Sequence, residues 1–184
     1  MLWLIRHGET EWSLSGAHTG RTDIPLTPKG EENARKTGEK LRGANFALVL
    51  SSPLQRARRT CELAGFAAQA QTEPNLLEWD YGSYEGRTTA DIQRDRPGWF
   101  LFRDGVPDGE RIDQVAERAT AVIERALGVN GDTALFAHGH ILRILTARWL
   151  GLAPEDARLF ALETGAISTL GYERETRVIR SWNR

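Results

Sequence analysis

The chain has 184 residues, of which 40% are hydrophobic, a size and composition that suit one domain with a substantial core. Its 24 Lys and Arg residues nearly balance 25 Asp and Glu residues, and the formal net charge of -1 offers no general attraction for nucleic acid or an anionic membrane. No apolar run reaches membrane-spanning length, and the first one, 2–5, is too short for a signal peptide. We therefore expect one soluble, cytoplasmic domain over 1–184 whose preference for anions is local.

Three short apolar runs are predicted to form strands: Leu2 to Ile5, Phe46 to Leu50, and Thr133 to Ala137. Each run is continuous rather than alternating, which is typical of strands covered on both faces in a parallel α/β sheet. Two further runs, 166–172 and 177–182, are predicted to form an outer strand pair. The pattern predicts an α/β fold.

Helices are predicted between these strands. Thr27 and Pro28 mark the start of an exposed helix that continues through Leu41. After the second strand, Ser52 is expected to cap a helix with Pro53 at its first position.

Two later segments carry stronger helical patterns. Apolar residues recur at helical spacing over 110–127, so this helix should face the sheet. Another helix is expected from Gly139 to Trp149, ended by Gly151. The only cysteine, Cys61, lies on the apolar side of the helix after Pro53 and is interpreted as a buried structural thiol.

The segment 79–109 has no clear period and mixes Gly, Pro, aromatic and charged residues. It is longer than most structureless connections inside a domain. We therefore expect a partly helical, lid-like insertion over a site.

Two of the four histidines directly follow predicted strands: His7 follows the first strand and His138 the third. Ligands of open α/β sheets usually bind at the carboxyl ends of the strands. The beginning of the chain and its later part are therefore expected to meet at one pocket.

The neighbours of His7 suit a phosphate. Arg6 is a forked and permanently charged donor, and Gly8 lets the backbone approach a bound anion. Arg56 is expected in the first turn of its helix, where its charge and the free N–H groups reinforce each other. Such a site keeps one nitrogen of His7 unprotonated, so that it can attack phosphorus and form a phosphohistidine.

Two further side chains are candidates for this site. The second ring nitrogen of His7 needs an orienting acceptor, either a backbone carbonyl or the hydroxyl of Ser52, whose alternative role is only to cap the helix. His138 can donate a hydrogen bond to a phosphoryl oxygen as charge redistributes in the transition state.

A departing alkoxide needs a proton, and Glu78 is the best candidate donor. Its neighbours Leu77 and Trp79 could desolvate the carboxyl and raise its pKa, as a general acid near neutral pH requires. The carboxylate could then activate water. By chemistry alone, Asp80 and Glu85 remain rivals.

Several blocks of the sequence together resemble the histidine phosphatase superfamily, the phosphoglycerate mutase-like family. They occur in family order across most of the chain, which is far more specific than one RHG tripeptide. The blocks are Leu4-Ile5-Arg6-His7-Gly8-Glu9-Thr10, 19–27, Ser51-Ser52-Pro53-Leu54-Gln55-Arg56-Ala57, 78–86 and Ala137-His138-Gly139-His140.

The resemblance implies a three-layer α/β/α fold with a mostly parallel central sheet flanked by helices. It implies Arg6, Arg56 and His138 around the phosphate, His7 as nucleophile and Glu78 as proton donor, with no required metal or cofactor. It also places four residues near the substrate: Thr19, Gly20, Arg21 and Tyr81. Together with three neighbours of the catalytic residues, Gly8, Ser52 and Gly139, they are the expected substrate-binding residues.

Within this family the sequence favours a phosphatase over a cofactor-dependent phosphoglycerate mutase. Such mutases keep a basic residue directly after the acidic glutamate, where this chain has Trp79. The stretch 77–86, with 104–105 and 108–110, is most similar to the sedoheptulose-bisphosphatase-like branch, which implies a small phosphorylated substrate, such as a sugar phosphate.

The insertion offers two candidate features for substrate recognition. Trp99, Phe100 and Phe102 are expected either to line it as a wall against the leaving group or to pack as ordinary aromatics. Its arginines are either available for a second phosphate or simply solvated: Arg94, Arg96 and Arg103.

Two alternatives belong to other classes of protein. His138 and His140 alternate along the chain, so on an extended segment both would face a metal, with Glu78 or Asp80 completing the shell. A degenerate phosphatase fold that binds a phosphorylated ligand without turnover is the non-enzymatic alternative.

Overall fold

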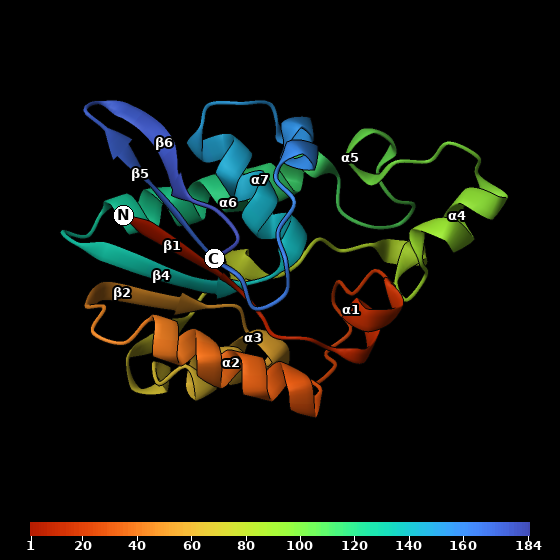
Figure 1. Cartoon of the computed structure of the whole chain (residues 1–184). Coiled ribbons are helices and arrows are strands. Elements are labelled where there is room, and N and C mark those ends of the chain that lie inside the picture. Colours follow the sequence, from red (N-terminus) through yellow and green to blue (C-terminus); the bar gives the residue numbers. More distant parts are fainter.

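The computed structural model describes all 184 residues, with one six-stranded sheet at the centre (Figure 1). The strand order is β3-β2-β4-β1-β5-β6. The first four strands in this order are parallel, whereas β5 runs antiparallel to β1 and β6 antiparallel to β5. The strands are β1 Leu2–Arg6, β2 Phe46–Ser51, β3 Ala70–Thr72, β4 Asp132–Ala137, β5 Ile167–Glu173 and β6 Thr176–Ser181.

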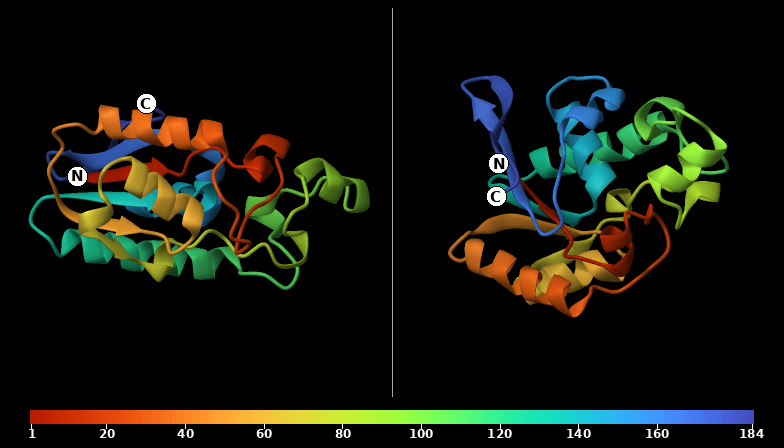
Figure 2. Two further views of the ribbon diagram at one scale, coloured as in Figure 1. Left: turned by 90° about the horizontal axis from the view of Figure 1, so that it is seen from below. Right: turned by 45° about the vertical axis from the view of Figure 1, so that its right-hand side comes forward.

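Helices cover both faces of the sheet, with α2 and α3 on one side and α6 and α7 on the other (Figures 1 and 2). This arrangement confirms the predicted three-layer α/β/α fold. The α-helices are α1 Glu11–Ser15, α2 Pro28–Lys40, α3 Gln55–Leu63, α4 Thr89–Asp95, α5 Leu101–Asp104, α6 Ile112–Leu127 and α7 Gly139–Trp149. The short 3-10 helices are η1 Ala67–Gln69, η2 Pro74–Leu76, η3 Gly82–Tyr84 and η4 Pro154–Leu159.

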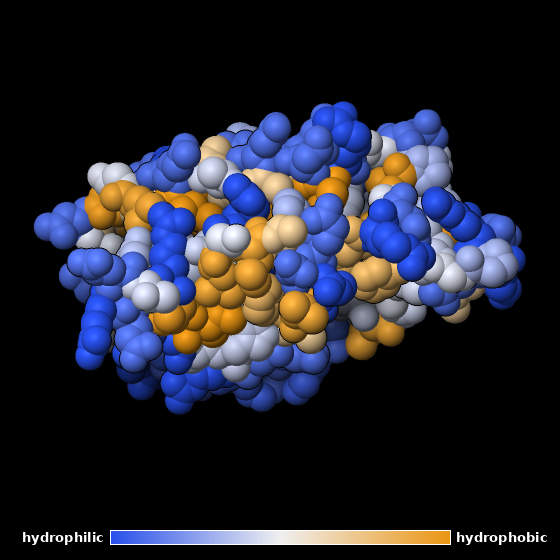
Figure 3. All heavy atoms as spheres, turned by 90° about the horizontal axis from the view of Figure 1, so that it is seen from above, coloured by the Kyte–Doolittle hydropathy of each residue, from blue (hydrophilic) through white to orange (hydrophobic).

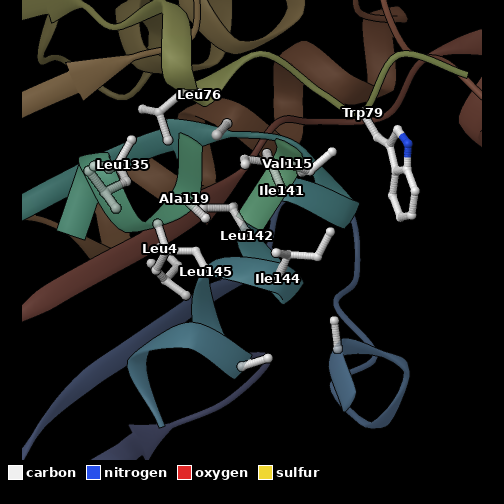
Figure 4. Close-up of a cluster of buried hydrophobic side chains, with 14 of the residues drawn as sticks. Leu4, Leu76, Trp79, Val115, Ala119, Leu135, Ile141, Leu142, Ile144 and Leu145 are labelled. Carbon is white, nitrogen blue, oxygen red and sulfur yellow. The ribbon is translucent and has the colours of Figure 1, made fainter. Parts of the chain in front are cut away.

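Two hydrophobic cores, one on each face, explain why the strands read as continuous apolar runs. Successive residues of a strand point to opposite faces, so Leu4 joins the core under α6 and α7, and Ile5 joins the core under α3. Leu135 and Phe136 divide in the same way. Figure 4 shows the larger core, where β1 and β4 meet leucines, isoleucines and alanines of α6 and α7.

The predicted helix starts are confirmed at Thr27 and wrong at Ser52. The Thr27 hydroxyl accepts a hydrogen bond from Gly30 N at 2.9 Å and caps α2. By contrast, α3 begins at Gln55 after an extended Leu54, so Ser52 is not its cap and Pro53 is not its first residue. The Ser52 hydroxyl instead lies 2.7 Å from His138 Nε2, across the sheet edge.

Two short elements were not predicted. Strand β3 has only three residues, too few to show a pattern of apolar and polar side chains. Helix α1 has five residues and depends on a capping box between Thr10 and Ser13. By contrast, Cys61 is buried as expected, and burial raises the pKa of its thiol to about 12.

The insertion 79–109 is partly helical, as expected, and extends beyond the sheet with α4 and α5 (Figure 1). Of the two interpretations of its aromatic residues, the structure supports ordinary packing and not a wall against the leaving group. Trp99 and Phe102 belong to the larger hydrophobic core, and the half-exposed Phe100 lines no cavity at the sheet edge. Arg94, Arg96 and Arg103 lie in ion pairs with Asp91 or Asp104.

The outer surface mixes hydrophilic and apolar side chains. On the face seen in Figure 3, apolar side chains gather in the middle and hydrophilic ones surround them. The most exposed large apolar residues, Leu159 and Leu14, lie on separate elements, η4 and α1, as is ordinary for a protein surface. None of the helices has the length and apolar composition that crossing a membrane requires.

Candidate active site

The site lies where the parallel strands β1 and β4 end side by side. His7 follows β1 and His138 follows β4, and their ring centroids are 5.1 Å apart. The His7 N–H donates to the carbonyl of Ala137 at 3.0 Å and continues the pairing of the strands by one step. The two segments therefore meet at one sheet edge, as the sequence predicted.

One nitrogen of His7 is free. Its Nδ1 lies 2.7 Å from the Gly8 carbonyl, an acceptor, so Nδ1 carries the proton and Nε2 keeps its lone pair. The orienting group is thus a backbone carbonyl and not the Ser52 hydroxyl. Burial, followed by the charges of Arg56 and Arg6, holds the pKa of His7 well below its ordinary value. The ring is therefore neutral at neutral pH, as a nucleophile requires.

The turn after His7 is fixed by close backbone packing. Gly8 N donates to the Thr60 hydroxyl at 3.1 Å, and a Cβ on Gly8 would lie 2.5 Å from the carbonyl oxygen of Gly30. Gly8 is therefore required by its contact with α2, a reason that the sequence did not reveal. Thr60 was missed because its position in a helix carries no catalytic signal.

Arg6 and Arg56 both lie beside His7 but differ in their contacts. Arg6 lines the cavity and donates from Nη1 to the Leu162 carbonyl, and its buried Nε has no partner. Arg56 is fully buried, and its Nη atoms donate to three carbonyls of the loop 19–22 at 2.9 to 3.1 Å. Arg56 thus contributes its charge to His7 while its donors hold the loop.

The contacts of His138 define its tautomer. Its Nδ1 accepts a hydrogen bond from Arg56 Nε at 3.1 Å, so the proton lies on Nε2, which donates to Ser52 Oγ at 2.7 Å. His138 is fully buried, and burial, followed by the charge of Arg56, lowers its pKa. Ser52, His138 and Arg56 therefore form a buried hydrogen-bonded chain behind His7.

Glu78 is the only acidic residue that lines the cavity. Its Oε1 accepts hydrogen bonds from Trp79 N at 3.0 Å and Ile141 N at 2.9 Å, and its Oε2 accepts one from His140 N at 3.0 Å. Two of these donors belong to the N-terminus of α7, where a negative charge is favourable. The carboxylate is thereby fixed, and Oε2 is the oxygen with the freer lone pairs.

The backbone that carries Glu78 is held from behind by Arg118 of α6. Its Nη1 donates to the carbonyls of Asn75 and Leu77 at 2.7 and 2.9 Å, and its Nε lies 2.8 Å from Glu110 Oε1. Arg118 was not predicted, because on α6 it reads as an ordinary polar-face residue.

The rivals of Glu78 point elsewhere. Glu85 Oε1 accepts hydrogen bonds from Gly20 N and Thr22 N, at 2.8 and 3.1 Å, and so holds the loop 19–22. Asp80 Oδ1 accepts a hydrogen bond from Gly82 N at 3.0 Å. Neither carboxylate lines the cavity.

The expected substrate-binding residues fall into two groups. Thr19, Tyr81 and Gly139 line the cavity beside His7. The others lie behind it or outside it, with Gly20 packed against the Trp79 carbonyl and Arg21 within 3.4 Å of Glu110 and 3.9 Å of Asp80.

The cavity itself has a volume of about 260 Å³, slightly below the range of drug-sized sites, so it suits a small metabolite. The cavity is also lined by residues that the sequence had not assigned to a substrate, among them Trp12, His18, Thr89, His140, Arg143 and Leu162. His18 directly precedes the motif block 19–27, which was the one available signal.

The metal-site alternative was wrong, because its geometric premise does not hold. The chain turns into α7 at Gly139, so His138 and His140 do not alternate along an extended segment. His138 contacts Ser52 and Arg56, whereas His140 Nδ1 lies 2.5 Å from the Tyr81 hydroxyl. No three His, Cys, Asp or Glu side chains are grouped to hold a metal ion.

All four histidines have lowered pKa values, which gives a direct test of the electrostatics. Burial lowers the pKa of His18 to about 4, and burial lowers those of His7, His138 and His140 well below 6.5. We expect no imidazole of the folded protein to titrate near pH 6.5 in ring-detected NMR spectra. Because the unfolded chain binds these protons at that pH, folding stability should fall as the pH drops below 6.5. The ring signal of His7 is assigned as the one that is missing from the spectrum of His7→Ala. If that signal titrates near pH 6.5 in the parent protein, the prediction is contradicted.

The fold and this site define a phosphoryl-transfer enzyme of the α/β class, with a neutral histidine, arginines and a fixed carboxylate around one small cavity. The family model of the histidine phosphatase superfamily (branch 1) matches residues 2–184. The chain belongs to this superfamily, and it is a phosphatase, the class of two of its curated relatives.

Two curated relatives and one solved structure illustrate the similarity. An acid phosphatase of Mycobacterium tuberculosis is 38% identical over 180 residues, covering 96% of this chain and 88% of that protein. Sedoheptulose 1,7-bisphosphatase of Saccharomyces cerevisiae is 36% identical over 182 residues, covering 81% of this chain and 67% of that protein. The structure of the open reading frame Rv3214 of M. tuberculosis superposes with a TM-score of 0.94 at 36% identity, covering 99% of this chain and 96% of that one.

Proposed function

We propose that the chain hydrolyses a small phosphate monoester, a sugar phosphate, through a phosphohistidine at His7. The observation that carries this proposal is the lone pair of His7 Nε2, which is left free because Nδ1 is bound to the Gly8 carbonyl. In the first step Nε2 attacks phosphorus, the bond from phosphorus to the leaving oxygen breaks, and Glu78 gives that oxygen a proton. Arg6 stabilises the phosphoryl oxygens with its forked donors, and the charge of Arg56 acts from behind.

The second step returns the site to its starting state. Water attacks phosphorus while the Glu78 carboxylate takes its proton, the bond between phosphorus and Nε2 breaks, and inorganic phosphate leaves. His138 is proposed to stabilise the transferring group by turning its Nε2–H from Ser52 to a phosphoryl oxygen. The hydrogen bond from Arg56 to His138 Nδ1 supports this role, because it keeps the proton on Nε2, the nitrogen that would donate.

Two observations favour a sugar phosphate and hydrolysis over mutase chemistry. One relative acts on sedoheptulose 1,7-bisphosphate by name. The residue after Glu78 is Trp79, whose fully buried side chain offers no positive charge with which to retain a bisphosphorylated intermediate. We also propose a cytoplasmic location, where such metabolites occur and where the unpaired thiol of Cys61 would stay reduced.

The test is release of inorganic phosphate from a panel of sugar phosphates, sugar bisphosphates, phosphoglycerates and nitrophenyl phosphate. We expect turnover that survives exhaustive chelation, with the highest kcat/KM on a sugar phosphate. Interconversion of phosphoglycerates without release would instead indicate a mutase. Saturable binding of esters without either reaction would indicate a binding protein.

A further inference from the structure

A second cavity, of about 590 Å³, lies on the sheet face that carries the smaller core and shares no residue with the active-site cavity. Both chain ends lie beside it (Figure 2). Its volume is within the range of small-molecule sites. Only one of the lining residues, Lys40 at the end of α2, belongs to a helix, so the helices leave this part of the sheet open. The lining residues are Met1, Trp3, Lys40, Ile167, Thr169, Arg180, Ser181 and Arg184.

The floor of this cavity is a row of side chains across three neighbouring strands. Trp3 of β1 pairs with Thr169 of β5, which pairs with Ser181 of β6, and paired residues point to the same face. The Trp3 indole is held in place because its Nε1 donates to Asp132 Oδ2 at 2.9 Å. The hydroxyls of Thr169 and Ser181 lie 2.8 Å apart, so one donates to the other and one hydroxyl hydrogen stays free. A fixed aromatic ring thus lies beside two hydroxyls.

A β-bulge directs a cation to the same cavity. Thr169 and Leu170 pair with Ser181 and Ile179, so Arg180 is an extra residue between two paired ones. In a regular strand Arg180 would point away from Ser181, whereas here both line the cavity. Gly171 provides the space, because a Cβ at this position would lie only 3.0 Å from Arg180 Cγ. The bulge and the glycine together place the Arg180 side chain on this face.

The positive charge of the cavity is not neutralised by the protein. Lys40 and Arg180 form no ion pair, whereas the other lysines of α2, Lys29 and Lys36, both pair with Glu32. No Asp or Glu side chain lines the cavity. Cations without counter-charges beside an apolar floor attract an organic anion.

We propose that this cavity is a binding site for a nucleoside phosphate, separate from the catalytic site. The base would stack on Trp3, the sugar hydroxyls would meet Thr169 and Ser181, and the phosphates would bind Arg180 and Lys40. Each part of the ligand corresponds to one part of the cavity. Inorganic phosphate would leave the ring and the hydroxyls uncovered, and an uncharged apolar molecule would leave the cations unpaired.

The probe for this proposal is adenosine 5′-(α,β-methylene)diphosphate, whose terminal phosphonate is bonded through carbon and offers no phosphate monoester to His7. It is titrated into isotope-labelled protein and followed by NMR. The backbone amides of Thr169 and Ser181 report on the second cavity, and those of Gly8 and Gly139 report on the active site. We expect saturable shifts at Thr169 and Ser181. Adenosine and pyrophosphate, tested separately, should each bind there at least about tenfold more weakly, because each lacks half of the contacts.

Arg180→Gln should weaken binding of the probe about tenfold, the loss expected for charge-assisted hydrogen bonds. Trp3→Leu should weaken it by a similar factor through lost stacking. Arg177→Gln is the matched control, since Arg177 lies on the same strand but its Cζ is 4.7 Å from the centre of the Trp149 ring and it does not line the cavity. Its affinity for the probe should equal that of the parent.

Three results would overturn the proposal. The first is a probe that shifts only Gly8 and Gly139 or gives no saturable shift at all. The second is equal affinity for the probe in Arg180→Gln and the parent, and this variant decides the matter if Trp3→Leu does not fold, because Arg180 is exposed. The third is adenosine or pyrophosphate binding as tightly as the probe, since the cavity would then recognise only one half of the ligand.

Discussion

His7→Ala should lower the rate of phosphate release by at least about 10⁴-fold, because it removes the attacking nitrogen, and the other histidine rings of the cavity, His140 and His18, contact Tyr81 and Thr89 instead. In rapid-quench experiments with radiolabelled substrate, the parent should form an acid-labile phosphoprotein before steady state, and the variant should form none. Burial of His7 is nearly complete, but its ring contacts His138 and the polar cavity more than the apolar core, so the variant should stay folded.

Folding of the variant is checked by circular dichroism and by the NMR signals of the remaining histidines. An undiminished acid-labile signal in a folded His7→Ala protein would show that another residue is the nucleophile. Loss of turnover with an unchanged labelled intermediate would place His7 in the second step only.

Glu78→Gln should lower the rate of phosphoenzyme formation from an alkyl phosphate by about 10²- to 10⁴-fold, the usual contribution of a general acid. The effect on a nitrophenyl phosphate should be much smaller, since this leaving group departs without a proton. Rates must be measured before steady state, because Glu78 is also proposed to activate water in the second step. The glutamine oxygen can replace Oε1 toward Trp79 N and Ile141 N, and only the hydrogen bond from His140 N to Oε2 is lost.

The control for this comparison is Asp80→Asn, which changes a neighbouring carboxylate that does not line the cavity. Its ratio of alkyl to nitrophenyl rates should match that of the parent. Equal slowing of both substrates in Glu78→Gln would mean that Glu78 acts through position or charge and is not the proton donor.

Much of the layered architecture could be predicted because burial on both faces leaves a local pattern. Continuous apolar runs such as Leu2 to Ile5 occur where both sides of a strand face helices, and the two cores contain alternate residues of these runs. Thr27 gave a helix start because its cap depends only on residues three positions away. The local pattern was misleading at Ser52, because the hydroxyl of Ser52 is bound to His138, which lies 86 residues later in the chain.

The meeting of His7 and His138 was also predictable, because each follows a parallel strand and parallel strands end at the same sheet edge. The resemblance of the motif blocks then favoured Glu78 over Asp80 and Glu85 and added Thr19. Local sequence therefore determined which residues are candidates for the chemistry and that most of them lie together.

Only the tertiary structure decided how these residues divide the work, because that depends on contacts between segments far apart in the chain. The orienting carbonyl of His7, the tautomer of His138 and the separation of Glu78 from Asp80 and Glu85 follow from hydrogen bonds that no spacing encodes. The aromatic residues Trp99 and Phe102 lie in the core, where Trp99 packs against Tyr84 and Phe102 against Trp79. Arg180 and Ser181 are neighbours in the sequence and would face opposite sides of a regular strand, and only the bulge in β6 turns both toward one cavity.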